Sequence, residues 1–123
     1  MTVLEFEAAH VGTDISHGVV STGASMTKSG DSGHYVLLQI PEDASSLREV
    51  YIEIDSQLNG RRNNIACSRL DDSTWVVDLC HHLRTDQDTT RVVIHLSQSL
   101  AEQLRAGLNT VASVAPRLVG NAT

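Results

Sequence analysis

A strict alternation of apolar and polar residues marks the centre of the chain. The apolar positions are Val50, Ile52 and Ile54, and the polar positions are Tyr51, Glu53 and Asp55. Because successive side chains of a strand point to opposite faces, this stretch predicts a strand with one buried and one polar face. Alternation or short apolar runs predict further strands at 3–8, 34–40, 64–70, 74–79 and 91–96, with a weaker candidate at 15–21.

Two turn sequences are expected to join the strands between residues 50 and 79 into a three-stranded meander. Asn59-Gly60 is a strong hairpin signal, because both residues tolerate a positive φ. A three-residue turn over 71–73 then pairs Leu70 with Thr74. A two-residue turn would instead flip the last strand and place its apolar residues beside the acids.

This register predicts an apolar face for the core and a polar face turned away from it. The apolar positions are Ile52, Ile54, Ile65, Cys67, Trp75, Val77 and Leu79. Cys80 is expected on the opposite face from Cys67, so that the two cannot form a disulfide without breaking the strand geometry. Two unpaired thiols fit a reducing compartment.

One convincing amphipathic helix is expected after the last strand, over 97–113. Ser99 and Glu102 have the spacing of a capping box. Apolar residues recur at helical spacing from Leu100 to Val111 and form one stripe, and Pro116 is expected to stop the helix. Residues 114–123 are then a C-terminal tail.

Together these elements predict an α+β fold in a single domain, 1–123, with its core in 33–113. We expect a mainly antiparallel sheet of about six strands, with the helix packed on one face. Residues 21–33 are rich in Ser, Thr and Gly and predict a flexible loop. Residues 80–90 form a second polar loop.

Composition and charge narrow the classes of partner. Hydrophobic residues make up 41% and charged residues 20% of the 123 residues, which is typical of a globular domain. The net charge of −6 argues against a nucleic-acid partner, because phosphates need Lys and Arg to neutralise them. No apolar run approaches the length of a membrane helix, and the N-terminus lacks the basic region of a signal peptide. We therefore expect a cytoplasmic protein.

The sequence contains no recognisable catalytic centre. The six His residues include the dense cluster Cys80-His81-His82, but none has a recognised metal-ligand spacing. Glu53 and Asp55 share an open face, where ordinary pKa values are expected rather than those of a catalytic pair. We expect no catalytic residue, cofactor or metal.

Several segments together resemble the immunity protein 10 family, small bacterial proteins encoded beside polymorphic toxins. They are H-Y-V-L-L-Q (34–39), V-Y-I-E-I-D-S-Q (50–57), W-V-V-D-L (75–79), and V-V-I-H-L-S followed by L-A-E-Q-L-R-A-G-L (92–108). The resemblance implies a cytoplasmic antidote that binds and blocks a toxin domain and has no catalytic residues. The sequence departs from the family at 58–64, where polar and basic residues such as Arg61-Arg62 replace small and aromatic ones.

The polar face of the meander is the expected docking surface for such a toxin. An aromatic residue among acids is typical of an interface anchor, and an acidic surface suits the basic cleft of a nuclease toxin. The predicted partner-binding residues are Tyr51, Glu53, Asp55, Gln57, Asn64 and Asp78. Two alternatives remain: a small metal-dependent hydrolase using the 80–88 loop, and a ligand-binding module with 21–33 as a lid.

Overall fold

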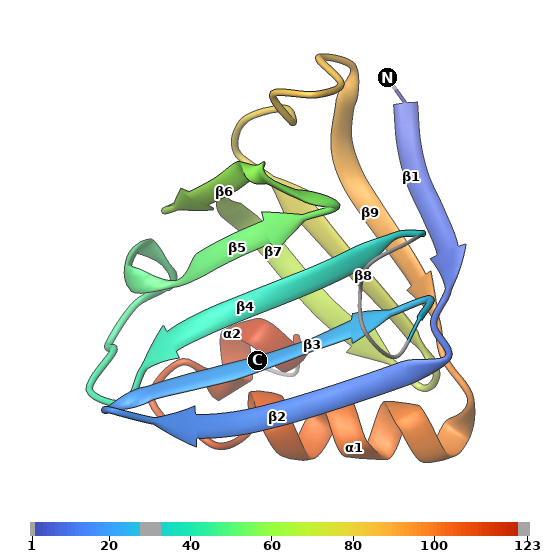
Figure 1. The fold of residues 1–123 in the computed structure, drawn as a ribbon. Helices are drawn as coiled ribbons and strands as arrows, with labels where there is room; N and C mark the ends of the chain where they lie inside the picture. The colour runs from blue at the N-terminus through green and yellow to red at the C-terminus, as the bar shows by residue number, and fades with distance from the viewer. Residues whose placement is uncertain (1, 28–32, 121–123) are drawn as a thin grey trace.

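The computed structural model describes residues 2–27 and 33–120, and it confirms the α+β class. In these residues nine strands form two sheets, and two α-helices follow the last strand (Figure 1). The strands are β1 (Thr2–Glu7), β2 (His10–Ser16), β3 (Val19–Ser25), β4 (Tyr35–Pro41), β5 (Tyr51–Ile54), β6 (Ser56–Arg62), β7 (Ile65–Asp71), β8 (Thr74–Leu79) and β9 (Thr89–His95). The helices are α1 (Gln98–Leu108) and α2 (Ala115–Val119), and a 3-10 turn, η1, spans Leu47–Glu49.

The two sheets divide the strands by position in the chain. Sheet A has the order β1-β9-β8-β7, with β1 parallel to β9 and the other pairs antiparallel. Sheet B is an antiparallel meander in the order β2-β3-β4-β5-β6. The chain crosses from sheet A to sheet B between β1 and β2, and returns between β6 and β7.

The core lies between the two sheets and is completed by the helices. Alternate residues of β4, β5, β8 and β9 point inward and are fully buried, including Leu38, Ile52, Trp75 and Ile94. Helix α1 packs on β2 and β3, and α2 packs on β7. In Figure 1, α1 runs along the lower rim of the molecule beside β2.

The mainly antiparallel pairing and the helix packed on a sheet are confirmed, but nine strands in two sheets replace the expected single sheet of about six strands in the described residues. The three-stranded meander is divided, because β5 and β6 belong to sheet B whereas β7 and β8 belong to sheet A. Asn63, with a φ of 57°, turns the chain at this crossing. Both β5 and β8 still bury their apolar residues in the one core, so alternation identified the faces correctly but could not identify the sheet.

The hairpin expected at Asn59-Gly60 is also wrong, because both residues lie inside β6. The turn is instead at Asp55, which has a φ of 65° and separates the paired residues Ile54 and Ser56. Asn59 is only 5% exposed. Its side-chain amide donates to the Ile54 carbonyl at 2.7 Å, so buried hydrogen bonds override its local turn preference.

The second turn is shorter than expected, and its register places Leu70 opposite Trp75 rather than Thr74. Asp72, with a φ of 56°, supplies the turn geometry. A bulge between Ile65 and Cys67 cancels this one-residue change of register, so that Ile65 still pairs with Leu79. As a result Cys67 is exposed rather than buried, and both Cys67 and Cys80 are free thiols.

Strands β2 and β3 of sheet B occupy a stretch where the sequence predicted only one weak strand and the start of a loop. The weak candidate at 15–21 spans a hairpin turn at His17-Gly18, where both residues have positive φ. Residues 21–25, expected to be the start of the flexible loop, belong to β3. Thr22 and Ala24 point inward and are buried there, and Thr22 lies against Gly107 of α1. The expected loop's residues 28–32 lie outside the described residues.

The C-terminal region is also more structured than expected. Helix α1 starts at Gln98 and is capped by Ser97, whose hydroxyl accepts a hydrogen bond from the Leu100 amide, rather than by the capping box expected from Ser99. It ends at Leu108 instead of 113. Pro116, expected to end helical structure, lies in the first turn of α2, where no amide hydrogen is needed. The expected tail therefore includes a helix, and its Leu118 is fully buried.

In the ranges 2–27 and 33–120, neither helix is long and apolar enough to cross a membrane.

Candidate functional site

The structure separates the six residues that were predicted to bind a partner. They are Tyr51, Glu53, Asp55, Gln57, Asn64 and Asp78. Tyr51 and Glu53 lie in β5 on the outer face of sheet B, which is the face turned away from the core. Asp55 forms the turn after β5, and Gln57 is exposed in β6. Asn64 and Asp78 lie away from this face.

Asn64 and Asp78 are engaged in contacts within the fold. Asn64 is 3% exposed and holds the backbone of His81, accepting from its amide at 2.7 Å and donating to its carbonyl at 3.3 Å. Asp78 lies on sheet A and accepts two hydrogen bonds from Arg91, at 2.6 and 3.2 Å. These bonds raise the pKa of the Arg91 guanidinium. Both side chains therefore have structural roles, and the expected single polar face does not exist.

Tyr35, Tyr51 and Glu53 form a compact group that we call the tyrosine–glutamate cluster. The Tyr35 hydroxyl donates to Oε2 of Glu53 at 2.5 Å, and the Tyr51 hydroxyl donates to Oε1 at 2.7 Å. Glu53 is only 9% exposed. Gly60 lies against Tyr51, since a β-carbon at Gly60 would come within 1.8 Å of the tyrosine oxygen. Gly60, which was expected in a hairpin turn, is thus needed because a larger residue would clash with Tyr51.

The cluster keeps both phenols protonated. Burial, together with the hydrogen bond to Glu53, raises the pKa of Tyr35 well above its usual value. The hydrogen bond to Glu53, with a smaller effect of burial, also raises the pKa of Tyr51. Both hydroxyls therefore remain donors to the carboxylate across the physiological pH range.

Asp55 links the turn after β5 to the start of β4. Its Oδ1 accepts from the Tyr35 amide at 3.1 Å, and its Oδ2 lies 2.7 Å from Nδ1 of His34. The His34 ring in turn lies 5.5 Å from the Phe6 ring, between centroids. Asp55 therefore helps to fix the backbone beneath the tyrosine–glutamate cluster.

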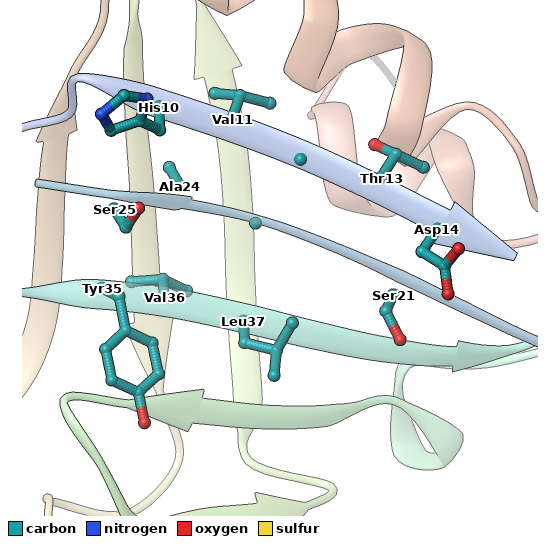
Figure 2. A pocket seen from close by; sticks show the side chains of 12 residues that line it. His10, Val11, Thr13, Asp14, Ser21, Ala24, Ser25, Tyr35, Val36 and Leu37 are labelled. Atoms are coloured by element: carbon teal, nitrogen blue, oxygen red, sulfur yellow. The ribbon is translucent and has the colours of Figure 1, made fainter. Parts of the chain in front are cut away.

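An open groove of about 680 Å³ lies on the outer face of sheet B, beside this cluster (Figure 2). Its floor is formed by Gly12 of β2 and Gly23 of β3, which are directly paired. Leu37 and Tyr35 of β4 line the side nearer the cluster, and Asp14 lies toward one end. The groove exists because two neighbouring positions carry no side chain.

The two glycines differ in what they allow. A β-carbon at Gly23 would lie 2.1 Å from the Val36 carbonyl oxygen, so this position requires glycine. A β-carbon at Gly12 would meet no atom within 4 Å. A side chain introduced at Gly12 would therefore extend into free space and occupy the groove.

The 80–88 loop is held in place by two buried asparagines. Asn64 binds its first residues, and Asn59 binds Thr85 by donating to its hydroxyl at 2.9 Å and accepting from its amide at 3.1 Å. His81 and His82 are exposed in this loop. Among the described residues, no three His, Cys, Asp or Glu side chains are grouped as metal ligands would be.

The groove-lining residues of β2 were missed in the sequence, whereas those of β3 were expected in a loop that covers a ligand site. The stretch H-V-G-T-D-I-S has few large apolar residues, so its alternation is weak. Glycine also counts against a strand in sequence-based reasoning. The pair Gly12 and Gly23 becomes informative only once the register places these residues opposite each other.

No protein-family model matches this chain, and no curated protein matches its sequence. The resemblance to the immunity protein 10 family therefore stays a prediction.

Proposed function

We propose that the protein binds a partner protein through the outer face of sheet B, and that the partner is a toxin domain which it neutralises. The observation that carries the proposal is the groove beside the tyrosine–glutamate cluster. Partly buried tyrosines next to a pocket are typical of interface centres. The toxin as partner, and a cytoplasmic location, follow from the family resemblance. The exposed thiols Cys67 and Cys80 are compatible with that location.

Charge supports a basic partner surface. The Glu53 carboxylate accepts hydrogen bonds from two neutral hydroxyls, and no Lys, Arg or His of the described residues forms an ion pair with it. Asp14 adds a second acid at the groove. With a net charge of −6 for the whole chain, these acids favour a basic protein surface over nucleic acid. The proposal involves no catalytic residue and no cofactor.

A small-ligand site is the second candidate. One observation favours it: Ser21, Gly23 and Ser25, which were expected in a lid, line the groove. They do so as part of β3, which lies in the floor of the groove. The hydrolase alternative gains no support from the described part of the 80–88 loop.

A groove-filling variant tests the proposal. Gly12→Phe adds a ring where the structure has free space, so the fold should remain intact while the groove is occupied. The family resemblance implies that a toxin domain is encoded next to the gene for this protein, and that domain is the partner to use. We expect the wild type to bind this domain and suppress its toxicity on co-expression, and Gly12→Phe to bind at least tenfold more weakly in a calorimetric titration.

Val3→Phe is the matched control, because Val3 is 42% exposed, lies in β1 of sheet A and does not line the groove. It should bind like the wild type. Failure of the wild type to bind or neutralise the toxin domain refutes the proposed function. Equal affinity of Gly12→Phe and wild type means that the partner binds elsewhere on the molecule.

A further inference from the structure

Strand β2 is an edge of sheet B that is open to pairing with another chain. It pairs with β3 on one side, and within the described residues no strand pairs with its other side. Its seven residues pair with β3 without any register shift, whereas the β1–β9, β5–β6 and β7–β8 pairs all contain one. His10–Ser16 also contains no Pro and no Lys, the residues that commonly block edge pairing.

Grooves flank this edge on both sides. The first is the outer groove over Gly12 and Gly23. The second, of about 380 Å³, lies between β2 and α1, where Val11 and Thr13 face Ala106 and Thr110. Figure 2 shows Thr13 pointing toward the helix, whereas Asp14 points over the sheet toward Ser21. The alternation of β2 thus directs successive side chains into two different grooves.

We propose that the partner binds by adding an extended strand to the free edge of β2. Every second backbone amide and carbonyl of an edge strand points away from its sheet, so an added strand can bond to them. The side chains of the added strand alternate between faces. One set would occupy the outer groove over Gly12, and the other would occupy the groove beside Ala106. Backbone pairing with pockets for alternate side chains is an established mode of peptide recognition.

The occupant is a segment of a different, basic protein rather than a second copy of this chain. Asp14 projects from β2 on the outer face, and a cross-strand Lys or Arg of the partner would pair with it. Two copies joined through β2 would bring together two chains that each carry a net charge of −6, and two copies of Asp14. Charge therefore favours the basic partner of the proposed function, on which this inference rests.

The groove beside the helix allows a test by substitution. Ala106 is exposed and lines this groove, so Ala106→Trp would fill it without entering the core. Ala112 is also exposed but lies outside the groove, which makes Ala112→Trp the matched control. With the same toxin domain as above, we expect at least tenfold weaker binding for Ala106→Trp and less than twofold change for Ala112→Trp.

Amide hydrogen exchange tests directly whether the partner binds as an added strand. It is measured by NMR on the free protein and on its complex with the toxin domain. Strand addition predicts that alternate amides of 10–16 become protected by at least tenfold in the complex. A complex without this alternating protection overturns strand addition but leaves the proposed function standing. Absence of any complex refutes both. Protection, already in the free protein, of the β2 amides that point away from β3, together with a dimer mass, would identify a second copy as the occupant and overturn the inference.

Discussion

Glu53 keeps its carboxylate almost out of contact with water, because two tyrosine hydroxyls take the place of solvating water. Each carboxylate oxygen accepts one of these bonds, so the buried group is hydrogen-bonded on both sides. Gly60 makes this arrangement possible by leaving room for the Tyr51 ring. At the scale of single residues, the outer face of sheet B is therefore a pre-organised surface in which three side chains fix one another.

The raised tyrosine pKa values make stability depend on alkaline pH. In the unfolded chain a tyrosine has a pKa of about 10, whereas the pKa of Tyr35 is higher in the folded protein. The folded state therefore retains a proton that the unfolded state loses. Below a pH of about 10, we expect the Tyr35 hydroxyl to leave the free energy of unfolding independent of pH. Above that pH, we expect the free energy of unfolding to fall as the pH rises.

Urea unfolding at several pH values between neutral and alkaline, with Tyr35→Phe beside the wild type, measures this effect. Above a pH of about 10, the free energy of unfolding of the variant should fall less steeply with pH, because phenylalanine has no hydroxyl proton to lose on unfolding. At neutral pH it should be less stable by about 1–3 kcal/mol, since the buried carboxylate loses one donor. An alkaline slope identical to that of the wild type would show that Tyr35 is not responsible.

At the scale of elements, local capping determines where α1 begins. Ser97 has an extended backbone, and its hydroxyl accepts from the Leu100 amide at 3.2 Å. Ser99 lies two residues further along the chain, where its hydroxyl is 3.5 Å from Nε2 of Gln103. The strand β9 ends at His95, so the chain has little length in which to turn, and the first available serine becomes the cap.

The two serines should therefore differ in their contribution to stability. We expect Ser97→Ala to lower the free energy of unfolding by about 1 kcal/mol, because it removes the cap. Ser99→Ala should change it by less than about 0.5 kcal/mol, as is usual for an exposed position. Chemical denaturation followed by circular dichroism gives both values. A larger loss of stability for Ser99→Ala than for Ser97→Ala would show that Ser99 caps the helix, as the sequence predicted.

At the scale of the whole molecule, the helices complete a core that the two sheets share. Trp75 is fully buried, and its indole nitrogen donates to the Ser68 hydroxyl at 2.9 Å. That hydroxyl donates to the Leu118 carbonyl of α2 at 2.6 Å. Sheet A and the C-terminal helix are thus joined by a buried hydrogen-bond chain as well as by apolar packing.

This arrangement makes the C-terminal helix part of the stability of the whole fold. Leu118→Ala should lower the free energy of unfolding by about 2–5 kcal/mol, because it leaves a cavity in the core. Arg117→Ala, at an exposed neighbour, should change it by less than about 0.5 kcal/mol. Unfolding monitored by the fluorescence of Trp75 gives both values. Equal effects would mean that α2 packs too loosely to contribute.

The candidate site was only partly predictable. Tyr51 and Glu53 were correctly placed on a face turned away from the core, because alternation within one strand is a local property. Asn64 and Asp78 were assigned to the same face through a register that assumed one sheet. Gly12 and Ala106 were not identified, and Gly23 was expected only within a loop, since glycine and alanine carry no functional signal until neighbouring elements leave space above them.

The sequence by itself determined the α+β class, the positions of β4, β5, β8 and β9, and the apolar stripe of α1. These features follow from the period of burial along each segment, which a few neighbouring residues specify. Tertiary structure decided which sheet each strand joins, where the hairpins turn, and that β2 has a free edge between two grooves. Such features depend on contacts distant in the sequence. The buried hydrogen bonds of Asn59, for example, outweigh the turn preference of Asn-Gly.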